Sequence, residues 1–436
     1  SLDRRDADLM TCELQKMNTV ESETADNRRG KLLLWILGGG LLFPLFFQLS
    51  GRIYHNVNLV VDSGGDVQFL PLPVSLIVCY GGLLLLAPRY RQAALSLKVI
   101  TAMVLAMALS LLLAGGKVEP RKVVLSVQVL LPLGGLVLGQ MIRDEDQIIP
   151  RAFLAVLLIT VPFQLLAGWV QGNVALTHHL YVFTIYQHFQ FVPLIFICSF
   201  AYSMSLLWDT YKRTFIVLIP VMFIYALESL SFLTIIALVV FVCAFAWVRL
   251  KGYRKLLVIL LISVVTAGIW AYPSLVQHHM GSNRSVKSQY IEKLKPLEQG
   301  EIPRNVTDRL ADWKLYGSGI VESAQTILIG HPAPFQREVK TSAHNWYLDV
   351  AYNFGLLALL PIFFLGACTA WLLWQKREAV PTAVFWLTAI VFYLVILDNN
   401  MKVSLRQPYP GIFTFFLWGM LLSRLQGIQR EHGSGC

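Results

Sequence analysis

The chain has 436 residues, of which 56% are hydrophobic and only 14% are charged, and its formal net charge is +10. Soluble domains carry about 25% charged residues, so this composition excludes an ordinary soluble protein and predicts a polytopic membrane protein. The positive charge does not indicate nucleic-acid binding, because the basic residues form no stripe with interleaved aromatic residues.

Residues 1–30 are polar with charges of both signs, and their composition predicts a disordered cytoplasmic tail. The apolar runs that follow are long enough to cross a bilayer core, which takes about 20 residues. The run 214–249 is too long for one crossing, and Glu228, Ser229 and Ser231 interrupt it, which predicts two short helices that meet at a turn. We expect twelve spans, near 31–50, 69–88, 94–115, 123–142, 152–172, 188–208, 214–228, 231–249, 255–276, 354–374, 381–398 and 409–424.

Lysine and arginine are unevenly distributed between the two faces of this layout, and the asymmetry predicts its orientation. Seventeen lie in segments on the side of the termini, against six in the short loops of the other face, so both termini are expected in the cytoplasm. The predicted fold class is all-α, with about twelve transmembrane helices and one large outward-facing loop that contains an amphipathic helix. The expected parts are a tail at 1–30, nine spans in 31–276, the loop at 277–353, three spans in 354–425 and a tail at 426–436.

The stretch from Thr341 to Gly355 stands where the polar loop meets an apolar run. His344 and Asn345 come first, so an imidazole and an amide are expected at the water–membrane interface. Histidine is the side chain whose ordinary pKa lies nearest neutrality, which suits it to accept a proton there. The alternative is a polar loop end beside an aromatic belt, formed by Trp346 and Tyr347.

The large outward-facing loop contains one predicted helix, from Val306 to Gly330. Thr307 or Asp308 is the expected N-cap, and Gly330, Pro332 and Pro334 are expected to end the helix. One alternative is an amphipathic helix that lies on the membrane surface. The other is a lid that carries Arg309 over a cavity. The residues expected along one face are Leu310, Trp313, Ile320 and Ile327.

Two further polar features leave alternatives open. The loop 172–188 carries three histidines, but no carboxylate or thiolate lies nearby, so a wall that binds sugar hydroxyls or an interfacial anchor is favoured over a metal site. Glu228 is the one carboxylate inside an apolar stretch. It is either a functional group at membrane depth or a solvated group near the outward surface.

The run from Arg309 through Trp313 to Gly330, followed by Ala343-His344-Asn345-Trp346-Tyr347-Leu348 and Gly355, resembles the shared segment of the bacterial O-antigen ligase and O-antigen polymerase superfamily. That family has an Arg-x-x-x-Trp helix before a His-Asn-x-Tyr-Leu motif in one large periplasmic loop. The chain departs from the pattern at Glu228-Ser229-Leu230-Ser231, where the family often has Ser-Arg-Gly, and at Gly330-His331-Pro332, where it has Gly-x-Gly. Family arginines are also missing from 172–187.

The resemblance implies an integral-membrane glycosyltransferase of the GT-C type that acts at the periplasmic face of the inner membrane. Its donor would be a glycan on undecaprenyl pyrophosphate. A ligase would pass the glycan to a lipid A-core sugar, and a polymerase would pass it to another lipid-linked repeat. The resemblance implies no cofactor and no metal. His344 and Asn345 would be the catalytic residues, with substrate contacts from Arg309, Arg284, Arg121, Lys122, Arg406, Trp313, Tyr347 and His188.

A transporter or flippase for a lipid-linked sugar is the alternative from another class. Transporters tend to show internal repeats or charged pairs at membrane depth. The sequence shows no internal repeat and indicates no buried pair of a basic with an acidic residue. We therefore expect an enzyme.

Overall fold

The computed structural model of the protein describes seven stretches of the chain, and the account below is limited to them. They are residues 28–50, 69–113, 119–170, 191–229, 231–249, 295–335 and 342–433. The predicted span 255–276 and most of the predicted tail 1–30 lie outside these described residues.

The first two predicted spans are only partly helical. Residues 28–42 form a helix, and the chain then continues as strand β1 (Phe46–Ser50). This strand pairs antiparallel with β2 (Phe69–Pro73), which leads into α2 (Val74–Leu85). Helices dominate the described chain as predicted, and this two-stranded sheet is the exception to an all-α fold. The helix α2 has 12 residues, fewer than the roughly 20 that a crossing requires.

The middle of the chain is a series of apolar helices. The short helical turn η4 joins α4 to α5, so that these elements form one continuous segment from Pro120 to Met141 that is long enough to cross a membrane. The bounds of this part are η3 Ala87–Ala93, α3 Ala94–Leu113, α4 Pro120–Leu130, η4 Leu131–Leu133, α5 Gly134–Met141 and α6 Ile148–Val170.

Helix α7 (Val192–Glu228) doubles back on itself at Tyr211, whose backbone leaves the helical region with φ −120° and ψ 33°. The rings of Phe196 and Tyr225 lie 5.8 Å apart, whereas a straight helix would separate these residues by about 43 Å. The two arms match the predicted spans 188–208 and 214–228. The predicted break after Glu228 is also confirmed, because the chain turns at Ser229 and α8 (Phe232–Arg249) begins three residues later.

The predicted loop helix is two helices. The first, α12 (Arg304–Ile320), begins after Pro303, so the expected caps Thr307 and Asp308 lie inside it. The second, α13 (Ala324–Ile329), has its own cap, because the Ser323 side chain accepts from the backbone N–H of Thr326 and the Thr326 hydroxyl accepts from that of Ser323. The predicted end is confirmed, since Gly330 closes α13 with φ 78°.

The C-terminal third places α14 directly before a long apolar helix. Gly355 separates the two with φ 78°, a backbone conformation that favours glycine. The remaining elements are α11 Lys295–Glu298, α14 Trp346–Phe354, α15 Leu356–Gln375, α16 Thr382–Phe392, η7 Tyr393–Asp398 (a π-helical turn), α17 Asn399–Met401, η8 Ser404–Arg406 and α18 Pro408–Gly433.

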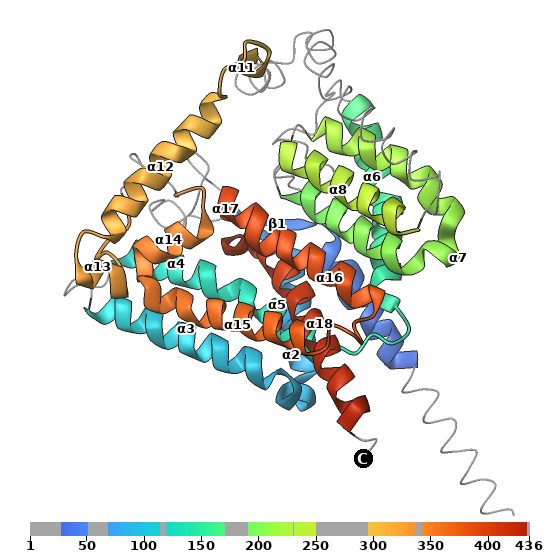
Figure 1. Cartoon of the computed structure of the whole chain (residues 1–436), viewed down its shortest axis with the longest axis horizontal. Helices are drawn as coiled ribbons and strands as arrows, with labels where there is room; N and C mark the ends of the chain where they lie inside the picture. The colour runs from blue at the N-terminus through green and yellow to red at the C-terminus, as the bar shows by residue number, and fades with distance from the viewer. Residues whose placement is uncertain are drawn as a thin grey trace, which may run out of the picture.

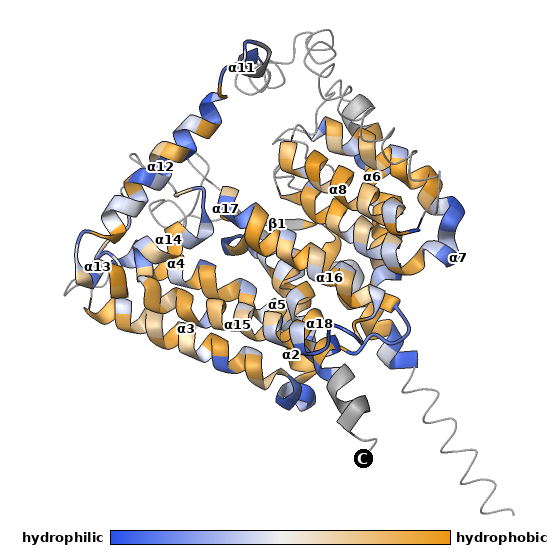
Figure 2. Cartoon of the chain, viewed as in Figure 1, coloured by the Kyte–Doolittle hydropathy of each residue, from blue (hydrophilic) through white to orange (hydrophobic). Residues whose placement is uncertain are grey.

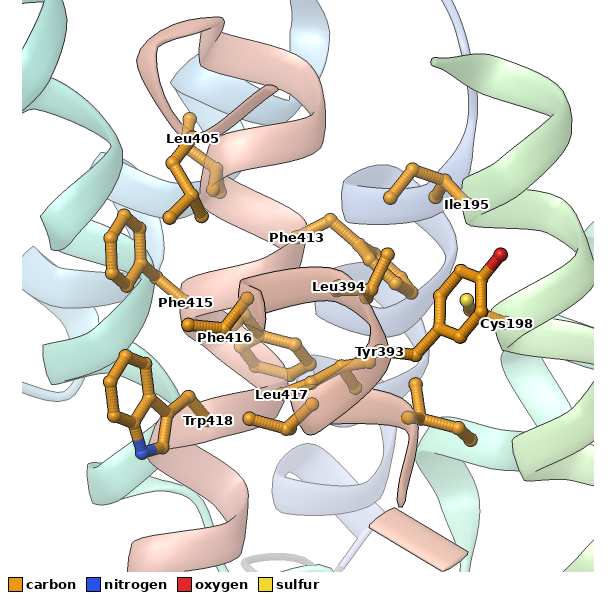
Figure 3. Packing of buried hydrophobic residues seen from close by; sticks show 14 of the residues in the cluster. Ile195, Cys198, Tyr393, Leu394, Leu405, Phe413, Phe415, Phe416, Leu417 and Trp418 are labelled. Carbon is orange, nitrogen blue, oxygen red and sulfur yellow. The ribbon is translucent and has the colours of Figure 1, made fainter. Parts of the chain in front are cut away.

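The core is centred on α18, which packs closely against α5. An added Cβ at Gly139 would collide with the carbonyl oxygen of Phe416, and one at Gly419 would collide with that of Leu136, so the backbones touch where glycine stands. Buried aromatic residues fill the space around this contact, as Figure 3 shows for Phe415, whose ring stacks on Trp418 with centroids 6.3 Å apart.

Seven helices among the described residues are long and apolar enough to cross a membrane, as expected of a polytopic membrane protein. Apolar residues colour most of the bundle, whereas polar residues concentrate on α11 and α12 and at the bend of α7 (Figure 2). Helix α12 extends from α13 toward α11, away from the apolar helices α3 and α15 rather than alongside them (Figure 1). The side of the membrane on which it lies stays a prediction.

Candidate functional site

The candidate site begins at the first residue of α14. Asn345 is the N-cap, and its side-chain oxygen accepts hydrogen bonds from the backbone N–H groups of Tyr347 (3.0 Å) and Leu348 (3.1 Å). The preceding residue, His344, is exposed and has φ 50°, a left-handed conformation that costs energy outside glycine. The cap therefore ends the loop at Asn345 and leaves His344 as the exposed residue directly before the helix.

A polar turn after η7 supports this terminus. The Asn345 side-chain amide donates to Oδ1 of Asn400 at 3.1 Å, and the Asn400 amide donates to the carbonyl of Ile396 at 2.7 Å. Neighbouring Asn399 spans the same turn, because it donates to the carbonyl of Leu394 and accepts from the backbone N–H of Leu405. With these bonds, Asn345 serves as a positioning residue for His344.

Arg309 lies on the half-buried side of α12, which packs against α14. Burial lowers the pKa of its guanidinium, and the nearby charge of Asp398 acts in the opposite direction. No hydrogen bond or ion pair to its side chain occurs within the described part of the chain. An arginine offers five N–H donors in a fixed fork that matches phosphate oxygens, so this side chain is prepared for an anionic ligand.

Two other side chains on the same row of α12 each have a polar atom without a hydrogen-bond partner in the described part of the chain. Asn305 precedes Arg309 by one helical turn and Trp313 follows it by one, so the three lie side by side. The Oδ1 atom of Asn305 and the indole Nε1 of Trp313 are buried without a hydrogen bond. Buried polar atoms are normally paired, so this row has unused capacity to bind a ligand.

Two buried ion pairs lie near the start of α14 and in the turns between η7 and α18, and the sequence had not indicated them. Asp398 pairs with Lys402 at 3.2 Å, and Asp349 pairs with Arg406 at 2.8 Å. Burial lowers the pKa of Lys402, whereas Asp398 raises it. Asp398 and Lys402 are four residues apart and pair locally, whereas Asp349 and Arg406 are 57 residues apart and meet where η8 packs against α14. The expectation that the chain has no buried acid–base pair was therefore wrong.

The placement of Arg406 gives it a structural role. Its side chain is 3% exposed and holds Asp349, which lies in the first turn of α14. Removing such an ion from water is costly unless a partner compensates it, and here the carboxylate does. Arg406 was predicted to bind phosphate, but in this structure it connects η8 to α14.

Arg121 and Lys122 were also predicted to bind phosphate, and both donate to backbone carbonyls. The ammonium of Lys122 is buried and bonds the carbonyls of His331 (2.7 Å) and Ser110 (3.3 Å). Arg121 bonds the carbonyl of Phe335 at 2.5 Å. The two cations hold the segment that follows α13 against α3 and α4.

Tyr347, another predicted substrate contact, is tied to the protein. Its hydroxyl donates to the carbonyl of Val395 at 2.8 Å, and its ring stacks on Phe363. Burial raises the pKa of this hydroxyl, so it stays protonated. The remaining two predicted contacts, Arg284 and His188, lie outside the described residues.

An aromatic stack behind α14 was missed in the sequence. The ring of Tyr352 lies between His331 (centroids 4.1 Å apart) and Phe335 (4.4 Å), and the imidazole Nε2 of His331 lies 2.9 Å from the carbonyl oxygen of Gly319. Burial raises the pKa of Tyr352 to about 12, with a contribution from Glu322. The stack fixes the end of α12 to α14. The only sequence signal was the His-Pro pair at 331–332, which had counted merely as a departure from the family pattern.

For Glu228, the structure gives the position of the side chain but no role. Glu228 is the last residue of α7 and is half-buried, beside the turn at Ser229. The described residues hold no group of three histidine, cysteine or acidic side chains placed to bind a metal.

A comparison with models of known protein families gave no match. A search of curated proteins likewise gave none.

Proposed function

We propose that this chain is an O-antigen ligase-like glycosyltransferase that moves a glycan from undecaprenyl pyrophosphate to a lipid A-core sugar at the periplasmic face of the inner membrane. The observation that carries the proposal is the Arg309 guanidinium, which is half-buried, free of hydrogen bonds among the described residues, and placed on the helix that packs against the one His344 precedes. A half-buried guanidinium without a hydrogen bond among the described residues is suited to bind the phosphate of a leaving group.

The proposed reaction is a single displacement at the anomeric carbon of the donor. An acceptor hydroxyl forms the new C1–O bond while the bond from C1 to the pyrophosphate oxygen breaks. The electron pair leaves with the pyrophosphate, the proton of the hydroxyl passes to His344, and the configuration at C1 inverts. Pyrophosphate is already a good leaving group, so the protein has only to place the reactants and stabilise the charge.

Arg309 is the residue proposed to stabilise that charge. Two parallel N–H donors of one guanidinium fit two phosphate oxygens, and such charge-assisted bonds strengthen as negative charge develops on the leaving group. Trp313 Nε1 lies on the same row of α12 and supplies a further donor. Partial burial strengthens each of these interactions, because less water competes for the phosphate.

His344 is proposed as the general base. It is exposed at the start of α14, on the part of the chain that the proposal places at the aqueous side. Asn345 and Asn400 hold the backbone beside it, so the imidazole needs little reorganisation to reach the hydroxyl. A positioned base typically contributes about 10²–10⁴-fold to the rate.

Purified protein in lipid nanodiscs, supplied with the lipid-linked donor and the lipid A-core acceptor, tests the proposal. We expect transfer by the wild type, a large loss in Arg309→Ala, and a loss in Arg309→Lys, which keeps the charge but not the fork. Arg304→Ala is the matched control, because Arg304 is 86% exposed on the same helix and pairs only with Asp308. Full activity of Arg309→Ala would contradict the proposal.

A polymerase that extends a lipid-linked glycan uses the same donor and is separated from a ligase by the lipopolysaccharide of a deletion strain. Loss of all capped bands, with lipid-linked polymer accumulating, indicates a ligase, whereas a cap of a single repeat indicates a polymerase. The buried Asp398–Lys402 pair favours a second candidate, a transporter of the lipid-linked sugar. A transporter would move labelled donor across sealed vesicles without any acceptor.

A further inference from the structure

The row of α12 that carries Arg309 has two chemically different ends. Asn305 lies one helical turn before Arg309 and Trp313 lies one turn after it, so the three side chains share one side of the helix. The Nε1 atom of Trp313 only donates a hydrogen bond, whereas the Oδ1 atom of Asn305 only accepts one. Both atoms are buried without a hydrogen-bond partner within the described part of the chain. A ligand that satisfies the whole row therefore presents an acceptor near Trp313 and a donor near Asn305.

A phosphate group complements only one end of this row. The oxygens of a pyrophosphate diester are ionised at neutral pH, so they accept hydrogen bonds from the Arg309 guanidinium and from Trp313 Nε1 but have no proton to donate. Asn305 Oδ1 stays unpaired beside such a group, and a buried acceptor without a partner is costly. The group that completes the row has to carry an O–H or an N–H. In a glycan joined to pyrophosphate, the sugar next to the phosphate carries such groups.

The direction of α12 agrees with this order of ligand groups. Helix α13 follows the C-terminal end of α12 and is fixed to the last turn of the apolar helix α3, because the Ser110 hydroxyl donates to the carbonyl of Ile329. In Figure 1, α12 extends from α13 toward α11. Trp313 is therefore the member of the row nearest to α3, and Asn305 lies about 12 Å farther along the helix axis. A lipid anchored among the apolar helices presents its phosphate first and its sugar beyond it.

We propose that Asn305 is a specificity-determining residue, whose Oδ1 accepts a hydrogen bond from a hydroxyl or an amide N–H of the sugar next to the pyrophosphate. This assignment rests on the proposed function, which supplies the phosphate on Arg309, and it adds the chemical group that the site recognises beside that phosphate. A site whose polar atom is left unpaired by a ligand binds that ligand less well. Asn305 therefore favours the glycosylated donor over the bare lipid pyrophosphate that transfer leaves behind.

The binding of two lipids that differ only in the sugar tests the assignment without any transfer. One is undecaprenyl pyrophosphate carrying a single N-acetylglucosamine, which presents both hydroxyls and an amide N–H, and the other is undecaprenyl pyrophosphate itself. Thermophoresis measures their affinities for the purified full chain in nanodiscs. We expect Asn305→Ala to weaken binding of the glycosylated lipid by about 2- to 10-fold, the effect of one lost hydrogen bond, and to leave binding of the bare lipid unchanged. Arg309→Ala should weaken both.

Thr307→Ala is the matched control, because Thr307 is exposed in the same turn of α12 and its hydroxyl donates only to the carbonyl of Arg304. It should bind both lipids as the wild type does, and Asn305→Ala should melt at the wild-type temperature. An equal loss for both lipids in Asn305→Ala, or no loss for the glycosylated one, would overturn the role of Asn305. If Arg309→Ala still weakens both lipids in that case, the proposed function stands without the sugar contact. If Arg309→Ala changes neither affinity, the proposed function fails as well.

Discussion

The side-chain amide of Asn345 donates to Oδ1 of Asn400 at 3.1 Å, across 55 residues of sequence. This bond joins the N-cap of α14 to the turn that follows η7. The same turn contains Asp398, whose charge acts on Arg309 of α12. The segment that contains Asp398 and Asn400 thus links the exposed His344 to the half-buried Arg309, although it is far from both in the sequence.

The first prediction concerns the N-cap of α14. Replacing a capping asparagine by alanine leaves two backbone N–H groups without an acceptor, so Asn345→Ala should lower the free energy of unfolding by about 0.5–2 kcal/mol. Asn345→Asp keeps the capping oxygen and loses only the bond to Asn400, so it should retain most of that stability. Thermal unfolding in detergent compares the variants. Equal melting of Asn345→Ala and the wild type would show that the cap contributes nothing.

The second prediction concerns the buried pair of Asp349 and Arg406. Asp349→Asn leaves the arginine charge buried without its carboxylate, so it should destabilise the protein by about 3–5 kcal/mol. The control is Asp209→Asn, which breaks the exposed pair with Arg249 and should cost less than about 1 kcal/mol. Chemical unfolding measures both. Costs of similar size would mean that the Asp349 pair is not held in a dry environment.

A third prediction follows from the contact of α5 with α18. Gly139→Ala adds a methyl group where the backbone of Phe416 leaves no space, so the helices must separate, at a cost of about 1–3 kcal/mol. Gly366→Ala in α15 meets nothing within 4 Å and should be neutral or slightly stabilising, because alanine favours helix. The measurement is the yield of protein that stays folded in detergent, compared between the two variants and the wild type. A fully stable Gly139→Ala would mean that the two helices are farther apart than described.

The fourth prediction tests the orientation of the chain. Thr307 is exposed on α12 and Lys212 is exposed at the bend of α7, and the distribution of basic residues places them on opposite sides of the membrane. In intact spheroplasts, an impermeant thiol reagent should label Thr307→Cys and spare Lys212→Cys until the cells are opened. The reverse pattern would invert the topology.

The apolar patterning of the sequence predicted most of the helices, because a run of about 20 apolar residues has few alternatives in a bilayer. It also predicted the break after Glu228, where Ser229 bonds the carbonyl of Ala226 and ends α7. The short strands β1 and β2 were missed, because their apolar residues have the composition of a membrane helix. The break of the loop helix at residues 321–323 was missed because the Ser323–Thr326 cap lies within an apparently continuous pattern.

The candidate site was predictable where a motif carried it and unpredictable where long-range pairing formed it. The sequence placed His344 and Asn345 where the polar loop meets an apolar run, but it did not predict α14 as a separate helix before Gly355. The cap role of Asn345 depends on backbone geometry that composition does not reveal. The partners Asn400 and Asp398 follow an apolar run and had seemed to be only its polar end. Arg406 carried the charge expected of a phosphate ligand, and only the fold shows that Asp349 already takes it.

The most direct test of the central claim is the rate of glycan transfer by His344→Gln, measured with purified protein, lipid-linked donor and acceptor, alongside donor binding. Glutamine preserves size and hydrogen bonding but cannot accept the proton, so we expect transfer to fall by about 10²–10⁴-fold while donor affinity and folding stay unchanged. Transfer at the wild-type rate, with donor binding unchanged, would contradict the account.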